Sequence, residues 1–209
     1  MRSPIVLSDW SAVGTYLALL KEPPAEAARF KGLPLQSPGV CAYLAVKGKP
    51  SSMYLRFKLD EGNRRCRLLI HPKAILRKSS GDDWSEARLL APMDYREAQR
   101  LGHDAQLEYL DRLLDEEWWR QGFSDVRVLA KRTPRMWSWD FNLYQDSMNP
   151  VMTAAFMRQG RIPHRSPYVS GLYLAGSSTH PGQWISFCMM SGIHAADCIV
   201  KDQSRGAGK

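Results

Sequence analysis

Short runs of alternating or mostly apolar residues predict several strands between residues 40 and 132. These runs are VCAYLAV (40–46), MYLRFKL (53–59), CRLLI (66–70), EARLLAP (86–92) and VRVLAKR (126–132). The turn-like residues DEGN (60–63) join the second and third runs into a hairpin, and SSGDD (79–83) is a surface loop. In the hairpin we expect Phe57 and Leu59 to face the core, and Arg56 and Lys58 to face solvent.

A helical pattern follows the fourth run. Asp94 and Glu97 have the spacing of a capping box, which marks the start of a helix. One face of this long helix would carry Leu107, Leu110, Leu114 and Trp118. Gly122 is expected to end it.

Both ends of the chain combine a strand with a helix. PIVLS (4–8) predicts a short strand, and Asp9 or Ser11 is expected to cap a helix that reaches about Leu20. Near the C-terminus, GLYLAGSSTHPG (171–182) predicts a strand and a tight loop of small residues, followed by a buried helix. Gly192 and Ala196, four residues apart, would form the face by which this helix lies against its neighbour.

The expected fold is α+β: an antiparallel sheet with a long helix, plus the terminal strand–loop–helix. The segments expected in it are a strand and helix (1–20), an α+β domain (21–132), an irregular aromatic and basic connection (133–170), the terminal strand–loop–helix (171–200) and a flexible tail (201–209). Aromatic residues of the connection are candidates for lining a substrate cavity: Trp137, Trp139, Phe141 and Tyr144.

Composition narrows the class of protein. With 209 residues and 44% hydrophobic residues, the chain is long and apolar enough to fold around a core. It contains no run of 18 uncharged apolar residues and no signal-peptide pattern. Its four dispersed cysteines have no disulfide-framework spacing. A cytoplasmic location is expected, and peripheral contact with a membrane stays open.

The net charge of +8 is concentrated between residues 56 and 78. A nucleic-acid interface is one interpretation of such a cluster. The alternating pattern favours the outer face of a hairpin instead, so no nucleic acid is expected as a partner. An acidic protein surface or lipid headgroups suit the same charges better.

Two catalytic patterns in the last helix fail on geometry. Cys188 and Cys198 would lie about 15 Å apart along a helix axis, too far for one tetrahedral zinc site with His194. Ser191, His194 and Asp197 share one helix and lack the sharp turn that exposes a hydrolase nucleophile. No metal site is expected.

The terminal motif carries a family resemblance. GLYLAGSSTHPG followed by SGIHAAD resembles the C-terminal signature of FAD-dependent oxidoreductases of the phytoene desaturase-like family, which are amine-oxidase-like flavoproteins. Upstream, PIVLSDWSAVGTYLALL resembles the strand and helix that re-enter the substrate half of such enzymes. AKRTPRMWSWDFN and LLDEEWWRQGFSDVRV resemble later segments more weakly.

The resemblance implies a cofactor site in the terminal loop. Its residues would lie at the ribityl and flavin-ring end of FAD: Gly176, Ser177, Ser178, Thr179, His180, Pro181, Gly182, Trp184 and Ile185. The two glycines would let the backbone approach the cofactor, the Thr179 hydroxyl would donate a hydrogen bond to it, and His180 would flank the ring. No catalytic residue is assigned, because the flavin accepts the hydride. The substrate would be a hydrophobic small molecule.

One signature of the family is missing. Such enzymes bind the ADP part of FAD with a GxGxxG loop, and this sequence has none. The resemblance therefore implies the C-terminal part of a split enzyme, whose Rossmann-like FAD-binding domain is completed by a GxGxxG-bearing chain. The first strand and the terminal strand–helix should then expose apolar surface. The alternatives are a partner-binding module without redox chemistry and, more weakly, a basic nucleic-acid-binding domain.

Overall fold

The computed structural model describes residues 3–48, 55–59, 65–70 and 84–206, and it divides the chain into two compact units. Unit 1 joins Met1–Gln36 to Leu143–Lys209, and unit 2 is the continuous segment Ser37–Asn142. The fold is α+β, as expected. The segment boundaries expected from the sequence differ from this division, because the aromatic connection after residue 132 is shared between the two units.

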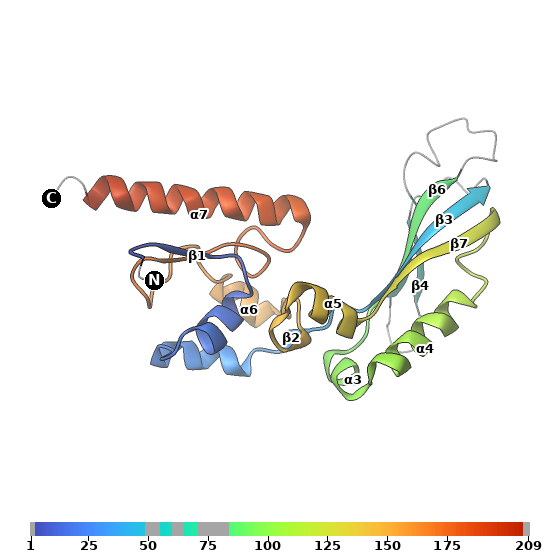
Figure 1. The fold of residues 1–209 in the computed structure, drawn as a ribbon, viewed down its shortest axis with the longest axis horizontal. Helices are drawn as coiled ribbons and strands as arrows, with labels where there is room; N and C mark the ends of the chain where they lie inside the picture. The colour runs from blue at the N-terminus through green and yellow to red at the C-terminus, as the bar shows by residue number, and fades with distance from the viewer. Residues whose placement is uncertain (1–2, 49–54, 60–64, 71–83, 207–209) are drawn as a thin grey trace. The chain divides into compact units, whose positions relative to one another are not determined.

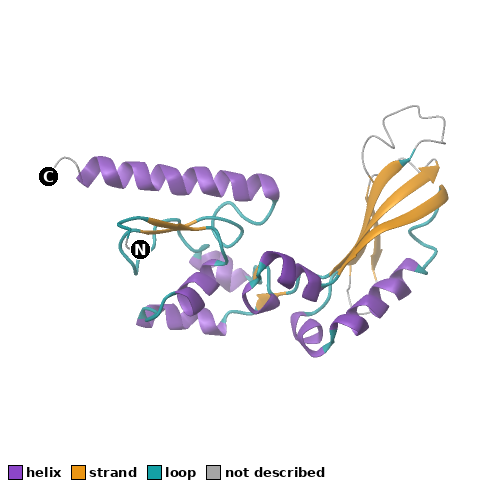
Figure 2. Ribbon diagram, viewed as in Figure 1, coloured by secondary structure: helices purple, strands orange, loops and turns teal. Residues whose placement is uncertain are grey.

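Unit 2 is built on a five-stranded antiparallel sheet with the order β4–β5–β6–β3–β7 (Figures 1 and 2). The strands are β3 (Val40–Gly48), β4 (Leu55–Leu59), β5 (Arg65–Ile70), β6 (Ser85–Ala91) and β7 (Phe123–Arg132). All five runs expected as strands are strands, and β4 and β5 pair as the expected hairpin. The turn at 60–63 and the loop at 79–83 lie outside the described residues.

One face of this sheet packs on the helices α3 (Tyr95–Arg100) and α4 (His103–Leu114). Asp94 caps α3 by accepting hydrogen bonds from the backbone N–H groups of Arg96 and Glu97. Buried side chains from β3, β5, β6 and α4 form the core, including Leu44, Leu68, Leu89 and Leu110. Each of these four leucines is at most 1% exposed.

The expected single long helix is wrong in two places. Leu101 and Gly102 separate α3 from α4, and α4 ends at Leu114 rather than near Gly122. Trp118 therefore lies in the turn after the helix and only borders the core. The neighbouring Trp119 is fully buried, and its indole N–H donates to the Leu113 carbonyl 3.1 Å away. That bond satisfies the buried indole N–H of Trp119 where the chain leaves the helix.

The expected orientation of β4 is also wrong. Phe57 and Leu59 are 56% and 64% exposed. Arg56 instead donates to the Trp119 carbonyl at 3.1 Å, and Lys58 pairs with Glu116 at 2.6 Å. The polar side chains find partners in the segment after α4, and this tertiary contact outweighs the alternation of apolar residues in an edge strand.

The stretch expected to be irregular contains helix α5 (Pro134–Phe141). Thr133 caps it, because its hydroxyl accepts the N–H of Met136 at 3.3 Å, and Pro134 occupies the first helical turn. Both signals are present in the sequence, since a threonine before a proline is a typical helix start. The many aromatic residues that follow have no clear helical pattern, which is why the sequence predicts an irregular stretch here.

Unit 1 consists of small elements from both ends of the chain and one long helix (Figure 1). Its N-terminal elements are β1 (Val6–Ser8), α1 (Ala12–Gly14), the π-helical turn η1 (Thr15–Leu19), the 3-10 helix η2 (Ala25–Gly32) and β2 (Leu35–Gln36). Its later elements are η3 (Tyr144–Asp146), β8 (Asn149–Pro150), α6 (Ala154–Gln159), β9 (Leu172–Leu174) and α7 (Ile185–Gly206). The strand and capped helix expected at the start are confirmed, with Ser11 as the cap.

Two short sheets tie these elements together. β1 and β9 pair in parallel, and β2 and β8 pair in antiparallel fashion. The core of the unit lies between α1, η1, η2 and β9, where Tyr16 stacks on Phe30 with ring centroids 5.4 Å apart. The Tyr16 hydroxyl donates to Ser166 at 2.8 Å, and burial raises the pKa of this phenol.

Helix α7 extends beyond the expected end at residue 200. It continues through Gly206, so most of the expected flexible tail is helical. Asp202 holds the last turns of α7 to the rest of unit 1, because it accepts hydrogen bonds from Arg165 at 2.5 Å and from the Tyr173 hydroxyl at 2.7 Å. None of the helices described here is both long and apolar enough to cross a bilayer.

Candidate functional site

The terminal loop connects β9 to α7 and lies against the end of β1. The parallel pairing continues one step past β9, since the Ala175 N–H donates to the Ser8 carbonyl at 2.9 Å. The chain turns at Gly176 and enters α7 at Ile185. The expected strand–loop–helix is thus formed, but the helix is not buried as expected, since Ile185, Met189 and Ile193 are more than 60% exposed. All nine candidate cofactor residues lie in one continuous segment of unit 1.

The two loop glycines are required by the backbone and by close neighbours. Gly176 has φ +92°, and a Cβ at this position would lie 3.0 Å from the Asp9 carbonyl oxygen. Gly182 has φ +147°, and its Cβ would lie 3.0 Å from an Arg161 guanidinium nitrogen. L-amino acids with side chains rarely adopt these conformations. Both glycines therefore have a folding role, whatever the loop binds.

The Thr179 hydroxyl is not directed toward a ligand. Thr179 is fully buried, and its hydroxyl donates to the Gly176 carbonyl at 2.9 Å. It also lies 3.1 Å from the Ser191 hydroxyl of α7, which in turn accepts the Gly176 N–H at 2.5 Å. Thr179 and Ser191 thus close the loop onto the helix. The expectation that Thr179 donates to the cofactor does not fit this geometry.

Ser178 links the loop to the rest of unit 1. Its hydroxyl accepts the N–H of Ala12, at the start of α1, over 3.2 Å, and it lies 3.4 Å from the Asn149 side-chain oxygen. The Asn149 amide donates to the Gln183 side chain at 2.8 Å. Neither Asn149 nor Gln183 is among the nine residues expected to form the cofactor site. Their roles depend on segments that are brought together only by the fold.

The side chains that remain accessible lie at the end of the loop. His180 is exposed, Trp184 is 63% exposed and Ile185 is 85% exposed. Partial loss of hydration lowers the pKa of His180, and the nearby Arg161 cation lowers it further. His180 is therefore neutral at neutral pH. These three residues, which we call the loop rim, border the N-terminal end of a 22-residue helix, where the helix dipole favours electron-rich groups.

Arg161 contacts the terminal loop through its guanidinium group. Its guanidinium donates to the Ser177 carbonyl at 3.2 Å and lies against Gly182. Partial burial lowers its pKa. Within the described parts of the chain, no carboxylate lies within ion-pair distance of this guanidinium. Ile162 beside it forms a parallel bridge with Thr179.

Helix α7 presents large apolar side chains away from the sheet. Ser191 and Ala195 are fully buried on the side that meets the loop and β9. At 100° per residue, a stripe of Ile185, Met189, Ile193 and Val200 lies roughly 140° around the helix from that buried side. These four residues, the α7 stripe, are between 62% and 85% exposed. Gly192 and Ala196 do not form the contact face that was expected of them: Gly192 has open space beside it and Ala196 is exposed.

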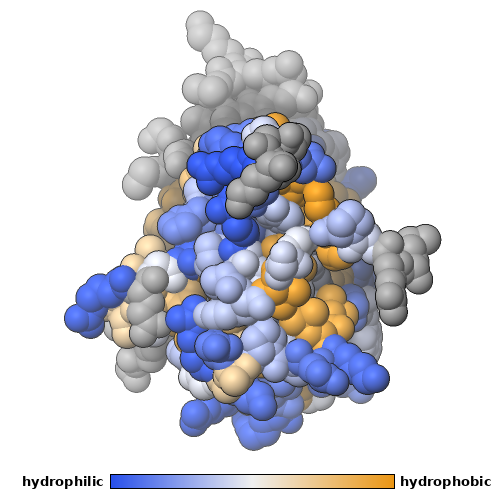
Figure 3. All heavy atoms as spheres, turned by 90° about the vertical axis from the view of Figure 1, so that its left-hand side faces the viewer, coloured by the Kyte–Doolittle hydropathy of each residue, from blue (hydrophilic) through white to orange (hydrophobic). Residues whose placement is uncertain are grey.

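The exposed apolar surface includes β1. Val6 and Leu7 are 50% and 48% exposed, whereas all three residues of β9 are buried. The expectation of apolar exposure is confirmed for the first strand and the helix, and is wrong for β9. Figure 3 shows apolar residues reaching the surface among hydrophilic ones on the side of unit 1 that it turns to the viewer.

The aromatic residues expected to line a cavity do not form one group. Trp137 and Phe141 lie against each other in α5, with ring centroids 5.5 Å apart, and Trp139 lies 5.2 Å from the ring of His103. All of these belong to unit 2. Tyr144 belongs to unit 1, where its ring meets Trp10 edge to face at 5.9 Å.

The described residues that could bind a metal ion do not cluster. Across residues 3–48, 55–59, 65–70 and 84–206, no group of three or more His, Cys, Asp or Glu residues has the arrangement of a metal site. The four cysteines are free thiols. Comparisons with known proteins add no assignment: no protein-family model matches this chain, and no curated protein sequence is similar to it.

Proposed function

We propose that unit 1 is the flavin-ring part of an FAD-dependent oxidoreductase of the phytoene desaturase-like kind, and that a second chain with a GxGxxG loop completes the cofactor site. The resemblance of the terminal motif to that family suggests the chemistry. The observation that carries the proposal is the incomplete architecture of unit 1. A two-stranded parallel sheet is flanked by a helix that has large apolar residues on its outer side.

Parallel sheets are normally buried on both faces and contain more than two strands. Residues 164–166 occupy the outer edge of β9 through an antiparallel bridge, so the edge left for a further parallel strand is the outer edge of β1, where Val6 and Leu7 are about half exposed. The α7 stripe is likewise typical of a helix that packs on both sides. Strands and a helix of a Rossmann half would bury both surfaces, and this half is also the part of the family fold that binds the ADP of FAD.

The loop rim is the part of the chain best placed to touch such a cofactor. It contains no acidic side chain, and it lies at the positive end of the α7 dipole. FAD would supply the hydride-accepting chemistry when bound. The residues of this chain would position the loop and exclude water. Arg161, Thr179 and Ser191 would hold the loop in its conformation, while Trp184 and Ile185 would keep water from one side of the site.

The experiment is a flavin-binding measurement on the chain alone and with any GxGxxG-bearing polypeptide that a neighbouring reading frame encodes. The chain alone should bind FAD weakly, because most contacts to the dinucleotide are missing, and the mixture should retain about one FAD per complex. Ile185→Asp should abolish retention without unfolding the chain, since this side chain is 85% exposed. Lys201→Asp, on an exposed position of the same helix, is the control. A chain that binds FAD tightly alone, or a complex without FAD, contradicts the proposal.

A further inference from the structure

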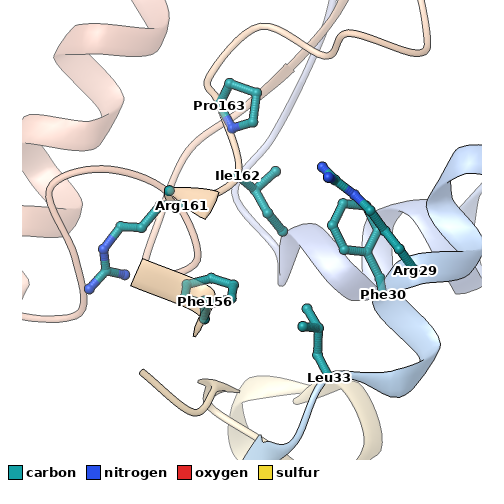
Figure 4. Close-up of a pocket in the computed structure, with 8 residues that line it drawn as sticks. Arg29, Phe30, Leu33, Phe156, Arg161, Ile162 and Pro163 are labelled. Atoms are coloured by element: carbon teal, nitrogen blue, oxygen red, sulfur yellow. The ribbon is translucent and has the colours of Figure 1, made fainter. Parts of the chain in front are cut away.

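Unit 1 contains a second candidate site, formed by other residues than the loop rim. A cavity of ≈ 350 Å³ lies between η2 and the segment from Phe156 to Pro163 (Figure 4). Its walls combine the apolar side chains of Phe30, Leu33, Phe156, Ile162 and Pro163 with polar surface from Arg29, Gly160 and Arg161. Cavities that bind small molecules begin at about 300 Å³, so this one suits a small ligand.

The cavity has a cation at its edge. In Figure 4, Arg29 turns its guanidinium toward Ile162, while the Arg161 side chain leads away from the cavity. Arg29 is held by aromatic faces, with its Cζ atom 4.9 Å from the centroid of Phe30 and 5.8 Å from that of Tyr168. Among the residues that the structure describes, no carboxylate pairs with Arg29.

The number of arginine side chains that face the cavity indicates how much negative charge a ligand could carry there. Arg161 also lines the cavity, but it donates to the Ser177 carbonyl and its side chain leads away from the cavity in Figure 4, so Arg29 is the cation best placed to meet an anionic group there. One guanidinium suits a monoanion, and its planar fork matches a carboxylate through two parallel hydrogen bonds. The residues lining the cavity include no acidic side chain that would repel such a group.

We propose that this cavity binds a small amphipathic carboxylate, with its hydrocarbon part between Phe30, Phe156 and Ile162 and its carboxylate on Arg29. This proposal does not depend on the flavin site. It concerns only residues of unit 1, and it predicts a ligand for the chain without any partner.

The test uses octanoate as the probe, followed by methyl NMR of the Ile162 and Leu33 side chains and by calorimetry. We expect saturable shifts at both residues, one octanoate per chain and a dissociation constant of about 1 mM or tighter. Octanol, which has the same chain without the charge, should bind at least about tenfold more weakly, because it cannot form a charge-assisted pair. Inorganic phosphate should produce no shift at either methyl group.

Two variants locate the head group. Arg29→Gln should weaken octanoate binding about tenfold or more while leaving octanol unchanged. The matched control is Arg158→Gln, an exposed arginine on α6 that does not line the cavity, and it should bind octanoate normally. Leu33→Trp should block the cavity to both probes.

Three results would overturn the proposal. Equal affinity for octanol and octanoate would show that Arg29 does not recognise the carboxylate. Octanoate shifts confined to the exposed Ile185 and Ile193 would show that the acid adheres to the α7 stripe instead. Absence of any saturable shift in the unmodified chain would show that the cavity has no such ligand, and this result does not rely on a variant that folds.

Discussion

The two units of this chain bury their apolar residues differently. Unit 2 covers one face of its five-stranded sheet with its own helices, and its core includes four fully buried side chains: Leu44, Leu68, Leu89 and Leu110. Unit 1 has a two-stranded parallel sheet, and its longest helix directs its largest apolar residues outward. Unit 2 thus has a larger core formed by its own elements, whereas in unit 1 the stripe of the longest helix is left exposed.

The largest expected effect contrasts a leucine of the unit 2 core with an isoleucine of the α7 stripe. Leu68→Ala should lower the free energy of unfolding by about 3 kcal/mol, because Leu68 is fully buried. Ile193→Ala should change it by less than about 0.5 kcal/mol in the chain alone, because Ile193 is 62% exposed. Urea denaturation of both variants checks this contrast. A cost above about 1 kcal/mol for Ile193→Ala would mean that the stripe is already packed.

A second contrast concerns two glycines of unit 1. Gly176→Ala should lower stability by about 1–2 kcal/mol, because it places a side chain at φ +92° and close to the Asp9 carbonyl. Gly192→Ala, in α7 with open space beside it, should raise stability by about 0.5–1 kcal/mol. Thermal unfolding of the two variants measures both. Equal effects would show that the loop conformation is not imposed by Gly176.

The hydroxyl network that joins the loop to α7 should have a smaller effect. Thr179→Val keeps the shape of the side chain but removes the hydrogen bond to the Gly176 carbonyl, at a cost of about 1 kcal/mol. Ser204→Ala, which removes an exposed hydroxyl bonded to Lys201 in the same helix, is the control and should cost less. If Thr179→Val leaves the melting temperature unchanged, the network does not stabilise the loop.

The smallest expected effect is the titration of His180. Its pKa in the folded chain lies below the usual 6.5 because the ring loses hydration and faces Arg161. Protonation then favours the unfolded chain, so His180 should lower stability only as the pH falls below about 6.5 and should have no effect above it. An NMR titration of the ring protons measures the midpoint, and Arg161→Gln should raise it. A midpoint at or above 6.5 contradicts this account.

Much of the fold could be predicted because its signals are local. The five strands of the unit 2 sheet, the Asp94 cap and the strand–loop–helix at 171–200 follow from patterns within a few residues. The orientation of β4 could not, because Arg56 and Lys58 find partners more than 50 residues away along the chain. An edge strand with such partners does not reveal its buried side through alternation.

The candidate site also has features that local patterns predict and features that they do not. The loop itself was predicted from its small residues, but the functions within it were assigned one by one from the resemblance. Whether a polar side chain is free or occupied depends on what the fold places beside it: the Thr179 hydroxyl donates to the Gly176 carbonyl, and Arg161 donates to the Ser177 carbonyl. Arg161 and Ser177 lie 16 residues apart along the chain, so no local pattern predicts their contact.

The central claim is that the α7 stripe is an interface for a second, GxGxxG-bearing chain, and methionine oxidation tests it most directly. Met189 is 70% exposed in the stripe, and Met93 is 5% exposed in the core of unit 2, so the two residues report on the two units. In the chain alone, peroxide should oxidise Met189 quickly and Met93 slowly. With the partner and FAD present, oxidation of Met189 should slow at least about tenfold, because its sulfur becomes buried, while Met93 stays as before. If Met189 is oxidised equally fast in a complex that holds FAD, the stripe is not the interface and the account of unit 1 is wrong.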